Sequence, residues 1–142
     1  MAESKKSLYR PSFPKKYKGD TSNIICRSSW ERKFCQYCDL NESILEWGSE
    51  EFWIPYRSPV DNKTHRYFPD FIIKVKESTG ELKTYVVEVK PRRQTKPPTK
   101  RSSLYEAKTY AVNQAKWKAA RNWCADRRIE FKIITEKELG IR

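Results

Sequence analysis

The sequence lacks several features that would place it in other protein classes. No run of about 18 apolar residues is present, so we expect no membrane span. No apolar signal segment stands near the start of the sequence, so we expect the protein to stay inside the cell. Histidine is nearly absent: the single one, His65, is expected on the surface. The four cysteines include one C-x-x-C pair, Cys35 and Cys38, without a second pair at zinc-finger spacing, so we expect reduced thiols.

Acidic residues are also few compared with basic ones. The 142 residues contain 30 Lys and Arg against 18 Asp and Glu, a net charge of +12, and the mean hydropathy is −0.91. Residues 1–18 carry six bases and one acid, 90–101 carry six bases and no acid, and 105–128 carry six bases and two acids, whereas 19–89 carry nine bases and twelve acids. Because an ordinary solvated surface mixes the two signs, this clustering indicates contact with a polyanion. The candidate DNA contacts are Arg92, Arg93, Lys96, Lys100, Arg101 and Lys116.

The chain is long enough for one domain preceded by a short tail. Residues 1–20 have prolines and lysines but no apolar period, which predicts an extended basic arm, and residues 21–142 form the domain. A helix is expected from near Trp30, capped by Ser28 or Ser29, with an apolar face of Trp30, Phe34, Tyr37 and Cys38. A second helix is expected over 105–126, with one side marked by Tyr110, Gln114, Trp117 and Arg121 and with Trp117 and Trp123 in the core.

Short runs typical of β-strands alternate with turn-forming residues over the rest of the domain. Strands are expected over 44–47, 52–56, 67–76, 85–90 and 130–135, turns over 58–63 and 77–81, and an exposed loop over 91–103. The turn over 77–81 pairs its two flanking strands as an antiparallel hairpin. This order of elements predicts an α/β fold, a mixed β-sheet flanked by helices.

Charged side chains interrupt the most apolar strand. Val87 and Val89 share one face of that strand, and Glu88 and Lys90 share the other. A carboxylate and an ammonium on such a strand are costly unless they are paired or bound to a metal. The predicted hairpin brings Asp70 near the same end as Glu88. Two carboxylates there offer oxygen ligands to a hard divalent cation.

This arrangement is typical of phosphodiester hydrolysis. A metal held there would bind a phosphate oxygen and lower the pKa of a bound water, while Lys90 would orient that water or stabilise negative charge. Glu31, on the first helix, would complete the coordination shell. The alternative is a set of cross-strand salt bridges on a solvated face, since Asp/Glu-x-Lys occurs seven times in the chain. Only the triplet at Glu88 ends a strongly apolar strand preceded by a Pro-Asp strand.

Asp70 followed by Glu88 and Lys90 after seventeen intervening residues, with Glu31 upstream, resembles the PD-(D/E)xK nuclease superfamily. Longer motifs are similar to the head completion nucleases of T-even-like bacteriophages: RSSWE at 27–31, IPYRSP at 54–59, YFPDF at 67–71, EVKP at 88–91 and NQAKW at 113–117. A weaker similarity links the same residues to transposon end-cleaving endonucleases of the TnsA type. The resemblance implies a restriction-endonuclease-like fold over residues 21–142.

The same resemblance also implies a catalytic site and a biological role. The catalytic residues would be Glu31, Asp70, Glu88 and Lys90, the first three of them ligands of Mg²⁺, for which Mn²⁺ would substitute. The protein would cut packaged DNA before heads join tails, as an endonuclease, with exonuclease activity as a second expectation. Its partners would be DNA and phage head or neck proteins, in the host cytoplasm and on the virion. Two alternatives stay open: a transposon-end or branched-DNA endonuclease of the same fold, and a non-catalytic DNA-binding virion component.

Overall fold

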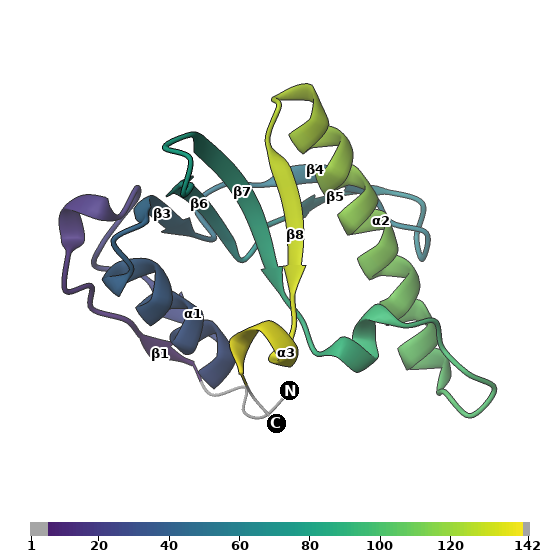
Figure 1. Ribbon diagram of the computed structural model, residues 1–142. Coiled ribbons are helices and arrows are strands. Elements are labelled where there is room, and N and C mark those ends of the chain that lie inside the picture. Colours follow the sequence, from purple (N-terminus) through teal and green to yellow (C-terminus); the bar gives the residue numbers. More distant parts are fainter. Residues whose placement is uncertain (1–5, 141–142) are drawn as a thin grey trace.

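A four-stranded mixed sheet forms the centre of the molecule in the computed structural model, which describes residues 6–140 (Figure 1). Its strand order is β3-β6-β7-β8, with bounds Ile44–Ser49, Phe71–Lys76, Leu82–Val89 and Glu130–Ile134. The first three strands are antiparallel neighbours, and β8 runs parallel to β7. The helices α1 (Ser29–Leu40) and α2 (Leu104–Asp126) flank the sheet. The predicted α/β class is confirmed.

Smaller elements surround this sheet. Two pairs of strands form separate two-stranded sheets: β1 (Ser7–Leu8) with β2 (Ile25–Cys26), and β4 (Ile54–Arg57) with β5 (Thr64–Tyr67). Two short 3-10 helices, Pro14–Lys16 and Arg92–Thr95, and a terminal helix α3 (Glu136–Leu139) complete the described residues.

The prediction of a single strand over 67–76 is wrong. The chain divides at Pro69 and Asp70, and its two parts, β5 and β6, pair with different partners. Proline has no backbone N–H to donate to a ladder, so a sheet hydrogen bond is lost at the point of division. The division leaves Asp70 between two sheets.

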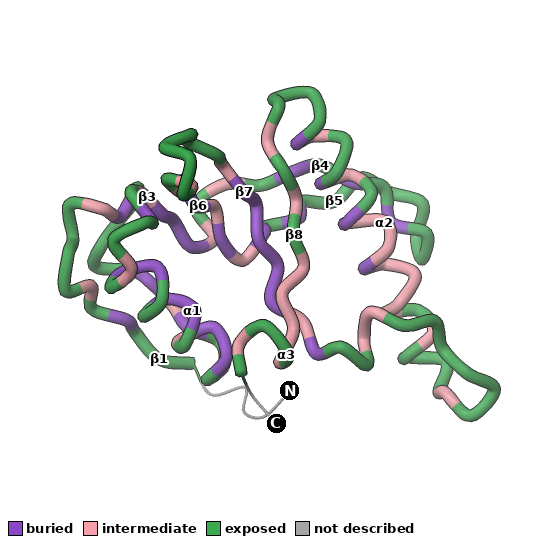
Figure 2. The backbone as a smooth tube through the Cα atoms, in the orientation of Figure 1, coloured by how far each residue is buried: buried purple, intermediate pink, exposed green. Residues whose placement is uncertain are grey.

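Each face of the sheet has its own core, because successive side chains of a strand point to opposite sides. On the α1 side, Trp47, Phe71 and Val87 pack with the helix and with the N-terminal segment. On the α2 side, Trp117 packs with Ile54, Tyr56 and Tyr67 of the β4–β5 hairpin. The strand β7 lies between these cores and is buried along its second half (Figure 2).

Helix α1 begins where the sequence indicates but turns a different face to the core. The Ser28 hydroxyl accepts a hydrogen bond from the Glu31 amide, 3.2 Å away, as an N-cap. Tyr37 was expected to be buried and is instead 52% exposed. Cys35 takes its place, because its sulfur contacts that of Cys26 on β2 at 3.5 Å. Both cysteines of the C-x-x-C pair are buried: Cys38 on the predicted apolar face, and Cys35 beside Cys26.

The N-terminal segment packs on the domain. The arm was expected over 1–20, of which 1–5 lie outside the described residues. Tyr9 and Tyr17 are buried in the α1-side core, and the Tyr9 hydroxyl donates to the buried Asp39 carboxylate at 2.7 Å. The Ser12 and Phe13 amides donate to the same carboxylate at 2.7 and 3.0 Å. Residues 6–20 thus form part of the fold rather than a separate arm.

Helix α2 also differs from its predicted face. Its buried residues are Asn113, Trp117, Ala120 and Cys124, and Arg121 is exposed. Trp123, expected in the core, is half-buried and stacks on Phe52 with ring centroids 5.0 Å apart. Within residues 6–140, none of the helices is both long and apolar enough to cross a membrane.

Candidate active site

Asp70 and Glu88 lie at the same end of the central hairpin, as predicted. The last register pair of β6 and β7 at this end joins Phe71 to Val87, so Asp70 stands beside the position of Glu88. The Val89 amide donates to Asp70 Oδ2 at 2.7 Å, which fixes this carboxylate against β7.

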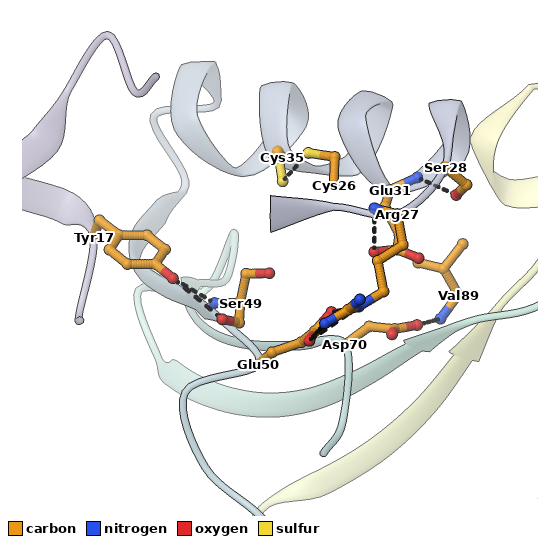
Figure 3. A network of polar contacts seen from close by, with 10 residues as sticks. All are labelled: Tyr17, Cys26, Arg27, Ser28, Glu31, Cys35, Ser49, Glu50, Asp70 and Val89. Atoms are coloured by element: carbon orange, nitrogen blue, oxygen red, sulfur yellow. Dashed lines mark hydrogen bonds and ion pairs between the residues drawn. The ribbon is translucent and has the colours of Figure 1, made fainter. Parts of the chain in front are cut away.

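Asp70 belongs to a cluster of three carboxylates. One oxygen each of Glu31, Glu50 and Asp70 lies within 4.8 Å of the others, and Figure 3 shows the three groups converging below α1. Glu31 comes from the first turn of α1, and Glu50 follows the end of β3. The Glu50 amide donates to the Asp70 carbonyl at 3.1 Å, which ties these two segments together.

Glu50 was not among the predicted site residues. Its position follows from the pairing of β3 with β6, whose last pair is Ser49 with Phe71. In an antiparallel pair, the residue after Ser49 lies beside the residue before Phe71. Glu50 could therefore be found from the sequence only by predicting the register of β3 with β6, and the sequence analysis does not predict that pairing.

Arg27 partly neutralises the cluster. Its guanidinium contacts the Glu50 carboxylate through Nε at 2.9 Å and Nη2 at 3.0 Å, and this pair raises the pKa of Arg27 (Figure 3). Its backbone amide also donates to Glu31 Oε1 at 3.2 Å. The cluster therefore has the positive charge of one guanidinium beside three carboxylates.

The electrostatics of the cluster fit a divalent cation. Burial raises the pKa of Asp70 well above its ordinary value, and the charges of Glu88 and Glu31 raise it further. Burial also raises the pKa of Glu31. The hydrogen bond from the Arg27 amide lowers this pKa, and the charge of Glu50 raises it. Crowded carboxylate oxygens with a shortage of positive charge are the donors that hard divalent cations bind. A metal can be held here.

Glu88 and Lys90 form a separate pair beside this cluster. Glu88 is 5% exposed, and its Oε1 accepts a hydrogen bond from the Tyr67 hydroxyl at 2.7 Å. Burial and Glu88 raise the pKa of Tyr67, so the phenol stays a donor. Lys90 Nζ lies 3.6 Å from Glu88 Oε2. The structure therefore groups Glu31 and Asp70 with Glu50, and holds Glu88 against Tyr67 and Lys90.

Comparison with known proteins identifies the family. Residues 41–136 match the family described as TnsA-like endonuclease N terminal. The chain belongs to this family. It is also 39% identical over 138 residues to the head completion nuclease of enterobacteria phage T4, covering 91% of this chain and 89% of that protein. The predicted resemblance and the nuclease class are confirmed.

The bases expected to contact DNA occupy two different environments in this TnsA-like nuclease. Five of them are exposed in the loop after β7: Arg92, Arg93, Lys96, Lys100 and Arg101. Lys116 is instead half-buried on α2, with Nζ 5.7 Å from the ring centroid of Tyr67. Burial lowers the pKa of Lys116, while the nearby Glu88 raises it. Lys116 thus lies against Tyr67, the residue that donates to Glu88, and close to the candidate site.

Proposed function

We propose that this nuclease is a magnesium-dependent deoxyribonuclease whose centre is the Glu31–Glu50–Asp70 cluster with Glu88 and Lys90 beside it. The observation that carries the proposal is the approach of three carboxylates within 4.8 Å at the end of the central hairpin. Mn²⁺ would substitute for Mg²⁺, because it also accepts carboxylate and water oxygens.

Each side chain of the centre has a distinct task in this proposal. Asp70, Glu31 and Glu88 hold the metal, and Glu50 adds a fourth carboxylate that Arg27 balances. When bound, the metal would act as a Lewis acid and lower the pKa of a water molecule that it binds. Lys90, whose ammonium lies 3.6 Å from Glu88, donates to the phosphate and stabilises the charge that develops on its oxygens. Tyr67 keeps the Glu88 carboxylate in place through its 2.7 Å hydrogen bond.

The exposed loop supports DNA as the substrate. Its five bases, Arg92, Arg93, Lys96, Lys100 and Arg101, directly follow the strand that carries Glu88, and no acid lies between positions 90 and 101. Cations at such a position attract phosphates and release counterions from DNA. In this proposal the loop holds the duplex while the carboxylate cluster faces the cleaved bond.

A plasmid-nicking assay tests the activity. The purified protein is expected to convert supercoiled DNA to nicked and linear forms in Mg²⁺ or Mn²⁺, and not in chelator. Asp70→Asn should lose cleavage by orders of magnitude, whereas the control Asp61→Asn, at an exposed residue whose contacts are His65 and the Lys63 amide, should cut at the wild-type rate. Full activity of Asp70→Asn in Mg²⁺ would show that the site is elsewhere.

The proposed biological role is to finish DNA-filled phage heads before tails are attached. It is supported by the 39% identity to a head completion nuclease across nine-tenths of both chains. The protein would then act in the host cytoplasm and on the virion, with head or neck proteins as partners. Phage carrying Asp70→Asn should accumulate filled, tailless heads in electron micrographs.

The match to TnsA-like endonucleases favours a second candidate, cleavage at transposon ends. Cleavage by the purified chain on plasmid without transposon ends supports the first role. Cleavage that requires such ends together with a partner protein would support the second.

A further inference from the structure

The β4–β5 hairpin has one buried and one open face. Its register pairs Ile54 with Tyr67 and Tyr56 with His65. Ile54, Tyr56 and Tyr67 point toward α2 and pack in the core around Trp117. Because side chains alternate along a strand, the residues between them point away from α2.

The open face of the hairpin combines aromatic and basic side chains. Trp53 and Phe68 flank the Ile54–Tyr67 pair and are 44% and 46% exposed. The Arg66 guanidinium lies 4.7 Å from the Trp53 ring centroid. We call this set the outer face: Trp53, Pro55, Arg57, Thr64, Arg66 and Phe68, all of them exposed and none acidic.

Packing does not account for the two outer aromatic rings. Phe52, next to Trp53 in sequence, packs on Trp123 and joins the α2-side core, but neither Trp53 nor Phe68 belongs to a core. A large ring held in water gains little of the burial that stabilises a fold. Two such rings, one of them contacted by a guanidinium, match the composition of nucleic-acid stacking surfaces.

The outer face adjoins the carboxylate cluster. Phe68 is two residues before Asp70, and Trp53 is three residues after Glu50. Two extended residues span at most about 7 Å and three about 11 Å, whereas nucleotides along one strand are spaced about 3.4 Å apart. Both rings therefore lie within a few nucleotides of a bond held at the cluster.

We propose that the outer face stacks unpaired bases of the DNA strand next to the cleaved bond, so that the preferred substrate carries single-stranded DNA there. This inference rests on the proposed nuclease function. Base faces inside a duplex are covered by their neighbours, so Trp53 and Phe68 can stack only on unpaired or terminal bases. Arg57 and Arg66 then pair with the phosphates of the same strand. Stacking of this kind does not depend on sequence.

Binding without metal tests the proposal apart from cleavage. Fluorescence anisotropy in chelator measures affinity for a labelled 20-nucleotide single strand and for the matching duplex. Trp53→Ala combined with Phe68→Ala should weaken single-strand binding at least about tenfold, since stacking on one ring contributes about fivefold or more and two rings are removed. Duplex binding should weaken less than about threefold. Tyr37→Ala, which removes an equally exposed ring on α1, should change neither.

Further variants separate stacking from other causes. The pair Trp53→Phe and Phe68→Tyr keeps both rings and should keep single-strand affinity, whereas Trp53→Leu with Phe68→Leu keeps apolar bulk and should lose it. Arg66→Gln should reduce the salt slope of binding by about one phosphate contact, and the ring variants should not.

Three results would overturn the proposal: equal losses on single strand and duplex, full affinity in the leucine pair, or unchanged single-strand binding in the alanine pair. Equal losses would indicate a general duplex contact, and unchanged binding would indicate a surface for a protein partner. Because these measurements contain no metal, they do not depend on whether the plasmid assay detects cleavage. A failure of the nuclease proposal is therefore distinguishable from a failure of this one.

Discussion

Asp70→Asn is expected to make the metal-free protein more stable while it abolishes cleavage. The oxygens of Asp70, Glu31 and Glu50 lie within 4.8 Å of one another. Two unit charges at that separation repel by about 3.5 kcal/mol at an effective dielectric constant of 20, and by about 0.9 kcal/mol in bulk water. Arg27 and the Val89 amide offset part of this repulsion, so we expect a net gain of about 1–2 kcal/mol. For a domain of this size, that gain raises Tm by about 3–8 °C.

The pH dependence of this gain has a definite sign. The raised pKa of Asp70 means that the folded protein binds its proton more tightly than the unfolded chain does. Ionised Asp70 therefore lowers stability at pH values above its folded pKa, and this cost disappears as the pH falls below the ordinary value near 4. The advantage of Asp70→Asn should be largest at pH 7–8 and should vanish in acid.

Thermal unfolding followed by circular dichroism measures both effects. In chelator at pH 7.5 the variant should melt above the wild type, and added Mg²⁺ should raise the Tm of the wild type far more than that of the variant. Asp39→Asn is the matched control, because this buried carboxylate accepts hydrogen bonds from Tyr9, Ser12 and Phe13. It should lose about 1–3 kcal/mol. An Asp70→Asn variant no more stable than the wild type in chelator would refute the reasoning, as would an equal Mg²⁺ shift in both proteins.

Three further variants probe other parts of the site. Lys90→Ala should lower the cleavage rate at least about 100-fold while DNA affinity, measured by gel shift, changes less than about twofold; a comparable loss in both would make Lys90 a binding residue. Neutralising the five bases of the loop should reduce the slope of log affinity against log salt by up to about 4.5, and an unchanged slope would mean that this loop faces away from DNA. Glu31→Gln and Glu50→Gln should each lower the rate at least about tenfold and raise the Mg²⁺ concentration needed for half-maximal cleavage. A wild-type Mg²⁺ titration in either would remove that residue from the metal shell.

The β6–β7 hairpin is the part of the site that local sequence signals determine most directly. The turn over 77–81 and the two apolar runs beside it determine an antiparallel pair, and that pair brings Asp70 to Glu88 without any further tertiary information. Local signals of this kind also located the start of α1 at its Ser28 cap. Glu31 could be placed at the edge of a buried face, because it follows Trp30 by one position on a helix.

The remaining features depend on contacts between segments far apart in the sequence. Glu50 reaches the cluster only through the pairing of β3 with β6, which no local pattern encodes. Cys35 rather than Tyr37 is buried on α1 because Cys35 contacts Cys26 on β2, a residue that the local pattern of the helix does not include. The N-terminal segment has no apolar period, and hydrogen bonds to the buried Asp39 carboxylate, 26 to 30 residues away, hold it in place.

The four carboxylates come from four successive parts of the chain, at positions 31, 50, 70 and 88, and Lys90 follows them. The backbone amide of Lys90 donates to the Ile134 carbonyl at 2.9 Å, in the last strand of the sheet. Residues 130–134 therefore have to leave the ribosome before the backbone of Lys90 acquires this support. A polypeptide that ends before β8 would carry all four carboxylates and Lys90 but would lack the strand that fixes the Lys90 backbone.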